Sequence, residues 1–388
     1  MKLLGLDYLN ISKHFNDEEI LLQNTLRKFV NKEVMPTIEE DFINSKFDLN
    51  LPRKLGNIGL LGITIPKKYN GADMNSIAYG LACQELERGD SGIRSFASVQ
   101  NSLVMYPIYK YGTESQKIKW LKLLSKGKLV GAFGLTESDY GSNPAGMLTN
   151  AKKIEKGYIL NGSKMWITNG NIADICIVWA KLNGDIHGFI VEKDMEGFSA
   201  PEIKNKWSLR TSATSELIFD NVFIPEENLL PKVKGLKGPL SCLTQARYGI
   251  GWGAIGASMA LYEASIKYAK ERKQFNAPIA SFQLIQEKLT WMLSEITKAQ
   301  LLALEVGRNK DSKSLRHQQV SLLKRNNVWM ARKCAKLARE IHGANGISSE
   351  YPIMRHLMNI ESVYTYEGTH EMHTLIIGHD ITDIPSYS

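Results

Sequence analysis

Cysteine is scarce in this sequence, and long hydrophobic runs are missing from it. Only four of the 388 residues are cysteine (Cys83, Cys176, Cys242 and Cys334), and none of them form the C-x-x-C spacing of a redox pair or zinc site. Widely spaced thiols in a chain of this size are typical of a reducing compartment, so we expect a cytoplasmic protein. No window approaches the ~18 apolar residues that span a bilayer, and the N-terminal segment resembles neither a signal nor a transit peptide. Membrane insertion is therefore not expected.

Charge is in modest excess on the basic side. Lysine and arginine number 48 against 40 aspartates and glutamates, which gives a net charge of +8. Such an excess is compatible with nucleic acid, anionic membranes or anionic small molecules as partners, and it does not choose among them. The hydrophobic share of 43% and charged share of 23% exclude a disordered chain.

The local sequence pattern changes twice along the chain. Apolar residues recur at helical spacing up to residue 128, short β-branched segments bounded by Gly, Asn or Pro follow, and long helical patterns return from residue 238. The middle strands have no helical patterns between them, which argues against a parallel doubly wound sheet. We therefore predict an α+β multidomain fold: an N-terminal α-helical domain (1–128), a middle antiparallel β domain (129–237), and a C-terminal domain resembling a four-helix bundle (238–388).

Two motifs have structural explanations. The segment 251–256 fits G-x-G-x-x-G, but no strand precedes it and helical sequence follows, so close helix packing explains it better than a dinucleotide site. His370 and His373, with His379 nearby, do not form an H-E-x-x-H motif. Two histidines three residues apart could share one face of a helix, but zinc requires at least three protein ligands. No metal site is predicted.

A basic segment spans residues 323–339. Leu323, Met330, Cys334 and Leu337 recur in it at helical spacing, which indicates the solvated face of an amphipathic helix. A nucleic-acid-binding helix is the less favoured interpretation. A helical nucleic-acid-binding protein therefore stays the alternative from a different functional class.

Three segments carry residues suited to chemistry. The polar, glycine-bearing loop GLTESDYGS (134–142) follows an apolar strand and offers backbone N–H groups and hydroxyls to a phosphate or a heterocycle. The segment KMWITN (164–169) places an aromatic plane and a hydroxyl on a strand, and TYEGT (365–369) places one carboxylate between an aromatic residue and a glycine. Each segment alone is weak evidence of a functional site, but the combination of the three is not weak.

These segments, together with 208–230, 271–286 and 339–347, resemble the motifs of the acyl-CoA dehydrogenase family, in the family's order and over essentially the whole chain. Within that family the sequence is most similar to the glutaryl-CoA dehydrogenases, on segments 87–98, 102–105, 246–252 and 320–327. The resemblance implies a helix–β–helix fold, FAD as cofactor, an electron-transferring flavoprotein as electron acceptor, and a homotetramer built on the C-terminal helices.

The resemblance also implies a catalytic base. Glu367 matches the family's base, and a carboxylate in an apolar pocket has the raised pKa that abstraction of a weakly acidic α-proton requires. Some relatives place the base immediately before the arginine that matches Arg247, but this chain has Ala246 there, which leaves Glu367.

Substrate choice depends on Arg94 in this interpretation. A buried cation facing a methyl-terminated acyl chain would be costly, whereas a dicarboxylic acyl group ends in a carboxylate that arginine can bind bidentately. Glu87, two helical turns earlier if the helix is continuous, would orient Arg94. The other substrate contacts implied by the resemblance are Ser95, Ser98, Ser142, Arg247 and Gly368.

The cofactor contacts follow from the same resemblance. FAD would be held by Phe133, Leu135, Thr136, Gly141, Ser142, Trp166, Ile167 and Thr168. A neighbouring subunit's FAD would be held by Arg272, Phe275, Gln283 and the segment from Glu340 through Gly343 to Ala344, and Thr369 and Glu371 continue the pattern.

The implied reaction is oxidation of glutaryl-CoA, followed by decarboxylation to crotonyl-CoA and CO2. The nearest alternative is an acyl-CoA dehydrogenase for another short-chain or dicarboxylic acyl-CoA, without decarboxylation. An oxidase that uses O2 directly is less favoured.

Overall fold

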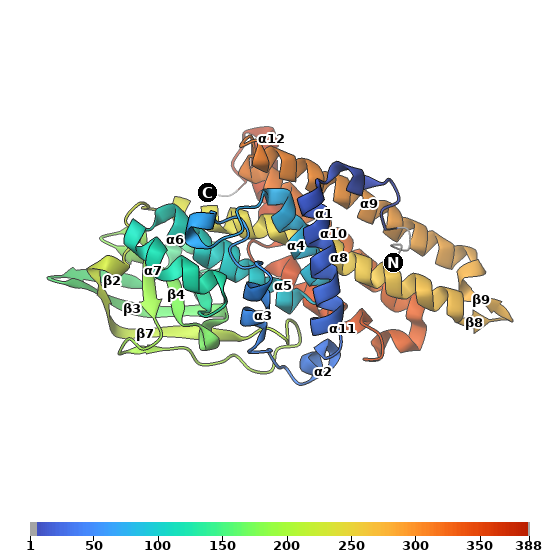
Figure 1. Ribbon diagram of the computed structural model, residues 1–388, viewed down its shortest axis with the longest axis horizontal. Helices are drawn as coiled ribbons and strands as arrows, with labels where there is room; N and C mark the ends of the chain where they lie inside the picture. Colours follow the sequence, from blue (N-terminus) through green and yellow to red (C-terminus); the bar gives the residue numbers. More distant parts are fainter. Residues whose placement is uncertain (1–5, 387–388) are drawn as a thin grey trace.

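A helical region, a sheet and a second helical region follow one another along the chain (Figure 1). The computed structural model describes residues 6–386. The sheet lies at one end of the molecule, the long C-terminal helices extend to the other, and the N-terminal helices pack between them. This arrangement confirms the predicted helix–β–helix fold class.

The N-terminal helices begin where the sequence signals are strongest. Asn16 caps the first helix in a reciprocal arrangement, accepting from the Glu19 amide at 2.9 Å while Glu19 accepts from the Asn16 amide at 2.8 Å. A π-helical segment, η4 (Val99–Met105), joins α5 to α6. The helices are α1 (Asp17–Phe29), α2 (Ile38–Ile43), α3 (Leu51–Asn57), α4 (Ser76–Gly89), α5 (Ser91–Ser98), α6 (Tyr106–Tyr111) and α7 (Glu114–Ser125).

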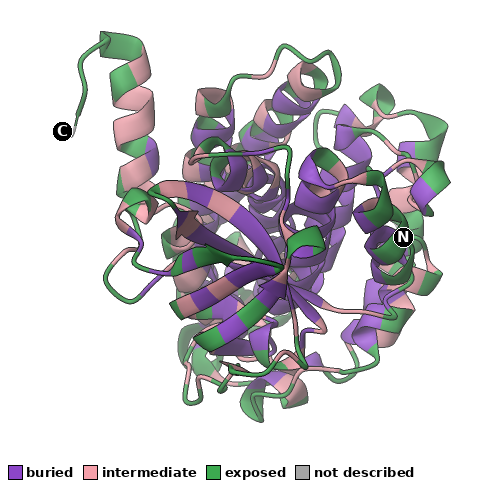
Figure 2. Cartoon of the chain, turned by 90° about the vertical axis from the view of Figure 1, so that its left-hand side faces the viewer, coloured by how far each residue is buried: buried purple, intermediate pink, exposed green. Residues whose placement is uncertain are grey.

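One main sheet forms the middle region. Its strands are β1 (Gly131–Gly134), β2 (Asn150–Ile154), β3 (Gly157–Thr168), β4 (Ile175–Leu182), β5 (Asp185–Glu192), β6 (Phe198–Ser199) and β7 (Thr214–Pro225). The order is β1-β4-β2-β3-β7-β6, with β5 also paired to β4. Buried residues alternate with more exposed ones along parts of β3 and β7, as expected of a sheet face in contact with solvent, whereas β1 and β4 are almost wholly buried (Figure 2).

The prediction of an antiparallel sheet needs one correction. The pairs β2–β3, β3–β7, β4–β5 and β6–β7 are antiparallel, but β1 and β2 each run parallel to β4. Parallel neighbours require a long connection, and here the β2–β3 hairpin and its flanking loops supply it in place of a helix. The sequence showed that no helices connect the strands, but it did not show that a hairpin and loops could connect parallel strands instead.

Five helices and a small hairpin form the C-terminal region. They are α8 (Lys237–Glu271), α9 (Gln283–Asp311), α10 (His317–His342), α11 (Ile353–Thr365) and α12 (His370–Thr382), with β8 (Lys273–Gln274) and β9 (Ala277–Pro278) between α8 and α9. The long helical patterns predicted from residue 238 correspond to α8, α9 and α10. None of the described helices is both long and apolar enough to cross a membrane.

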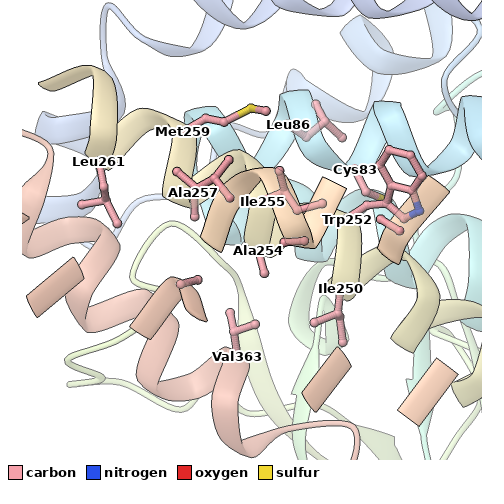
Figure 3. Packing of buried hydrophobic residues seen from close by; sticks show 14 of the residues in the cluster. Cys83, Leu86, Ile250, Trp252, Ala254, Ile255, Ala257, Met259, Leu261 and Val363 are labelled. Atoms are coloured by element: carbon pink, nitrogen blue, oxygen red, sulfur yellow. The ribbon is translucent and has the colours of Figure 1, made fainter. Parts of the chain in front are cut away.

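Close packing of α8 against α4 and α10 explains the G-x-G-x-x-G motif. The motif lies inside α8, where a Cβ on Gly251 would overlap Leu323 and a Cβ on Gly256 would overlap the Gln84 carbonyl. Figure 3 shows Trp252, Ile255 and Met259 of α8 beside Cys83 and Leu86 of α4. The interpretation of the motif as helix packing, not dinucleotide binding, is therefore confirmed.

Candidate active site

Glu367 lies in the short connection between α11 and α12. Thr369 caps α12, its Oγ1 accepting from the Met372 amide at 3.1 Å. Glu367 has φ of 54° and Gly368 has φ of 94°, so two consecutive residues adopt the left-handed region. For a non-glycine residue this conformation is uncommon and persists where surrounding contacts determine it, which is frequent at functional sites.

Glu367 is half-buried as a residue, and one of its two carboxyl oxygens is turned into the protein. Its Oε2 atom is buried, with no hydrogen-bond partner among the described residues. Burial raises the pKa of Glu367, while the positive charges of Arg94, Lys324 and Arg247 oppose that rise. A carboxylate with a raised pKa and a free oxygen has the properties of a proton acceptor.

Arg94 and Glu87 form a fully buried ion pair. Arg94 Nε donates to Glu87 Oε2 at 2.6 Å, and both side chains are 0% exposed. A second guanidinium nitrogen of Arg94 donates to the Tyr366 hydroxyl, next to Glu367. The third nitrogen, Nη1, is buried and has no hydrogen-bond partner in residues 6–386, and the same is true of Glu87 Oε1. A buried guanidinium nitrogen without a partner is costly unless a ligand supplies an acceptor.

The route by which Glu87 reaches Arg94 differs from the prediction. The helix is not continuous: α4 ends at Gly89, and Asp90 is extended and caps α5 by accepting from the Gly92 amide at 2.7 Å. Arg355 and Asn359 of α11 donate to Asp90 Oδ2 at 2.9 and 2.8 Å and hold this break. The ion pair therefore joins two helices whose relative direction is set by Asp90.

Space for the ion pair depends on a glycine of α8. A Cβ at Gly253 would overlap Glu87 Oε2 and approach Arg94 Nε to 3.1 Å. We expect Gly253→Ala to lower the free energy of unfolding by about 1–3 kcal/mol, because overpacking exceeds the gain in helix propensity. Gly378→Ala in α12, where the nearest atom is Ser386 Oγ at 3.7 Å, is the matched control and is expected to be neutral or stabilising. Equal thermal midpoints for both variants would contradict this account.

The other predicted substrate residues lie in three different places. Ser95 and Ser98 are buried on α5 with Arg94, and Ser98 Oγ has no described partner. Ser142 is exposed in the loop after β1. Arg247 was predicted to contact CoA, and in the structure its Nε donates to the Glu367 carbonyl at 2.7 Å.

The loop after β1, predicted to hold FAD, is fixed by a buried lysine. Lys164 Nζ donates to the Leu135 carbonyl at 3.1 Å and to Glu137 Oε1 at 2.8 Å. Glu137 in turn accepts from the amides of Leu148 and Thr149 at 2.6 and 3.0 Å. Phe133 and Leu135 are buried beneath the loop, Thr136 is half-buried, and Gly141 and Ser142 are exposed. Lys164 and Glu137 have no role in the sequence interpretation.

Trp166 has an unusual environment for a tryptophan. Its side chain is 61% exposed, its φ is 62°, and the β3–β7 register shifts between Lys164 and Ile167. A bulge of this kind redirects a side chain. Ile167 points into the core at 3% exposure, and Thr168, the last residue of β3, is half-buried. The exposed indole is available for stacking against a planar group.

Most of the residues predicted to contact another subunit's cofactor lie at the end of the molecule opposite the main sheet. Figure 1 places β8 and β9 at the end of the molecule remote from β2, β3 and β7. Phe275 is 91% exposed on this hairpin, and Arg272, Gly343 and Ala344 line a shallow depression beside it. Gln283 and Glu340 are also exposed. One chain therefore does not bring this group to Trp166. Thr369 and Glu371 lie instead at the start of α12, next to Glu367.

The basic segment 323–339 lies on α10 and needs a correction. Leu323, Met330 and Cys334 are buried as expected, but Lys324 is also buried, at 1% exposure. Its Nζ donates to the carbonyls of Tyr366 and Gly368 at 2.7 and 2.6 Å. Helical spacing could have predicted the burial of Lys324, because position 324 lies between positions 320 and 327 on the apolar face of the helix.

The three histidines of the 370–379 segment differ in burial. His373 is fully buried, and burial lowers its pKa to about 2, while His370 is half-buried and His379 is exposed. Among the described residues, no group of three or more His, Cys, Asp or Glu side chains could hold a metal ion.

Comparison with known proteins identifies the family. The models of the N-terminal, middle and C-terminal domains of acyl-CoA dehydrogenases match residues 16–128, 132–222 and 234–382. An acyl-CoA dehydrogenase of Bacillus subtilis (strain 168) is 36% identical over 370 residues, covering 94% of this chain and 98% of that protein.

Solved structures similar to this chain support the same family. Glutaryl-CoA dehydrogenase from Mycobacterium smegmatis is 47% identical with a TM-score of 0.97, covering 99% of this chain and 100% of that chain, and a second structure of it contains FADH2. Butyryl-CoA dehydrogenase from Megasphaera elsdenii is 34% identical with a TM-score of 0.91, covering 95% and 98%. With the fold and all three domain models in agreement, the chain is a member of the acyl-CoA dehydrogenase family.

Proposed function

We propose that this protein is an FAD-dependent glutaryl-CoA dehydrogenase that converts glutaryl-CoA to crotonyl-CoA and CO2. The observation that carries the substrate assignment is the buried Nη1 of Arg94, which has no acceptor among the described residues. A dicarboxylic acyl group would supply that acceptor with its distal carboxylate. The 47% identity to a glutaryl-CoA dehydrogenase supports the same choice.

The proposed roles follow from the geometry. Glu367 takes the α-proton of the acyl thioester, and bound FAD would supply the acceptor for the β-hydride. The distal carboxylate, now vinylogous to the thioester, leaves as CO2, and its bonding electrons pass into a dienolate that is protonated to give crotonyl-CoA. Arg94, oriented by Glu87 and Tyr366, binds the distal carboxylate before that step. Ser95 and Ser98 line the same buried segment.

The chain's residues fit an FAD site. The loop at 135–142 is held rigid by Lys164 and Glu137, and the indole of Trp166 is exposed beside it on β3. These features suit a planar ring with a phosphate-bearing tail. The fit agrees with FAD as the cofactor of the acyl-CoA dehydrogenase family.

An oligomer is part of the proposal. Helix α12 carries the apolar run LII (375–377), yet His373 is its only buried residue, and it stands apart from the body in Figure 2. Arg272, Phe275, Glu340, Gly343 and Ala344 are exposed at the end of the molecule remote from the main sheet. A homotetramer built on the C-terminal helices would cover these surfaces and bring the far-end residues to a neighbour's FAD.

Two further assignments complete the proposal. The electron acceptor is an electron-transferring flavoprotein, as the family resemblance implies. We also propose a reducing, cytoplasmic location, for which the support is that all four cysteines are free and buried.

The test uses the purified holoprotein under anaerobic conditions. We expect a flavin spectrum, bleaching at about 450 nm when glutaryl-CoA is added, and release of CO2. No bleaching would contradict the proposal. Bleaching with accumulation of glutaconyl-CoA would favour a dehydrogenase without decarboxylation, and faster bleaching with butyryl-CoA would favour a short-chain enzyme. Aerobic production of peroxide at the rate of turnover would indicate an oxidase.

A further inference from the structure

Lys324 is a buried lysine whose hydrogen bonds both go to backbone carbonyls. Its Nζ lies 2.7 Å from the Tyr366 oxygen and 2.6 Å from the Gly368 oxygen, and the residue is 1% exposed. A buried ammonium is costly, and an apolar side chain of similar volume is often the more stable choice. Its presence therefore needs a reason beyond packing.

The residue between those two carbonyls is the candidate base. Arg247 Nε donates to the Glu367 carbonyl at 2.7 Å, so the carbonyls of three consecutive residues each accept from a cation. The two cations come from different helices, α8 and α10. These helices are joined at the same level by a hydrogen bond of 2.9 Å from Asn327 Nδ2 to the Gly251 carbonyl. The 366–368 backbone is therefore held from two sides by a rigid pair of helices.

This backbone is one that needs such support. Both Glu367 and Gly368 have positive φ, at 54° and 94°. The left-handed region costs a glutamate conformational energy, and the strained form persists only where contacts determine it. The described hydrogen bonds of the two cations supply those contacts.

We propose that Lys324 is a positioning residue for the reaction: with Arg247 it fixes the 366–368 backbone so that the Glu367 carboxylate stays in the buried pocket that contains Arg94. This inference rests on the proposed function, in which Glu367 accepts the α-proton. Lys324 does not touch the substrate in this account, and it acts through the loop and through its charge.

Burial lowers the pKa of Lys324 to about 7, so below that pH its positive charge acts on Glu367 together with other groups. Lys324, Arg94 and Arg247 each favour the ionised form of Glu367, against the effect of burial. Removing one of the three cations therefore raises the pKa of Glu367 further, and the base is then ionised only at higher pH. The titratable groups that face this cluster from the surrounding elements are Cys83, Glu87, Arg94, Arg247, Lys324, Tyr366, His370, Glu371 and His373.

The experiment compares Lys324→Gln and Lys324→Met with Lys310→Met, all as purified holoenzymes. Lys310 is the matched control: a half-buried helical lysine of the same region whose Nζ donates to Ser76 Oγ at 3.2 Å, away from the 366–368 loop. We expect both Lys324 variants to slow anaerobic flavin reduction by about 100-fold at saturating acyl-CoA, because misplacement of the base affects kcat more than KM. In the Lys324 variants, the acid limb of the pH–rate profile is expected to move to higher pH. Lys310→Met is expected to change neither the rate of flavin reduction nor its pH dependence.

A second measurement does not depend on turnover. The Glu367 carboxyl is titrated by infrared difference spectroscopy, with Glu367→Gln as the blank, and Lys324→Gln is expected to raise its midpoint. An unchanged midpoint in Lys324→Gln would overturn the positioning role, as would a rate loss that only matches the loss of bound flavin or folded protein. If wild-type protein is reduced by no acyl-CoA, the proposed function fails, while the carboxyl titration still decides the role of Lys324.

Discussion

Glu367→Gln is expected to slow anaerobic reduction of the flavin by acyl-CoA by about 10³–10⁴-fold, within the range for loss of a general base. Glutamine is close in shape to glutamate but does not accept the α-proton. The fold should be retained, because Oε2 of Glu367 has no described hydrogen-bond partner to lose. The thermal midpoint is expected to equal or exceed that of wild type, since a buried charge is removed. Stopped-flow reduction and differential scanning calorimetry measure the two effects.

The control for this variant is Glu361→Gln. Glu361 lies on α11, six residues before Glu367, and pairs with Arg332 at 2.8 Å on the surface. We expect this control to reduce flavin at the wild-type rate. In the wild-type protein, the reduction rate should fall as pH decreases through the raised pKa of Glu367, because the protonated carboxyl is not a base. A Glu367→Gln protein with near-normal rates would remove Glu367 from the mechanism.

Replacing Arg94 by methionine is expected to reduce turnover of glutaryl-CoA by roughly 10²–10³-fold. The physical reason is that the distal carboxylate loses its partner in a buried site, and breaking such a pair costs about 3–5 kcal/mol. Butyryl-CoA ends in a methyl group, so its turnover should decline less or rise. The measured quantity is the ratio of kcat/KM values for the two substrates in wild type and variant.

The single Arg94 variant also leaves Glu87 buried without its partner, which could lower stability for an unrelated reason. The double variant Glu87→Gln with Arg94→Met removes both charges, and replacing a whole buried pair is often nearly neutral. If glutaryl-CoA and butyryl-CoA lose activity equally in the stable double variant, Arg94 does not read the distal carboxylate.

The sequence predicted the features that depend on local pattern. Helical spacing predicted the long helices that return from residue 238, which are α8, α9 and α10, since an amphipathic period acts within one element. Small residues in 251–256 predicted close helix packing for the same reason. The position of Glu367 in a connection between helices, not within one, also agrees with the glycine that follows it.

Features that depend on tertiary contact were not predictable in the same way. Helical spacing places Lys324 on the apolar face of α10, but nothing local shows that Lys164 and Lys324 donate to backbone carbonyls distant in sequence. The parallel pairing of β1 with β4 depends on which strands meet after a long excursion. The Asp90 break reflects donors from α11, more than 260 residues away. In each case the deciding partner is distant in sequence.

The glycine of α8 that leaves room for the Glu87–Arg94 pair has an evolutionary consequence. A relative that exchanged this ion pair for apolar residues would leave a void above residue 253, and a larger residue there would then be favoured. Once that larger residue is present, restoring the pair is blocked by overlap. Positions 87, 94 and 253 are therefore expected to change together. The preference for a carboxylate or a methyl group at the distal end of the acyl chain is then inherited with all three residues, and no single substitution converts one preference into the other.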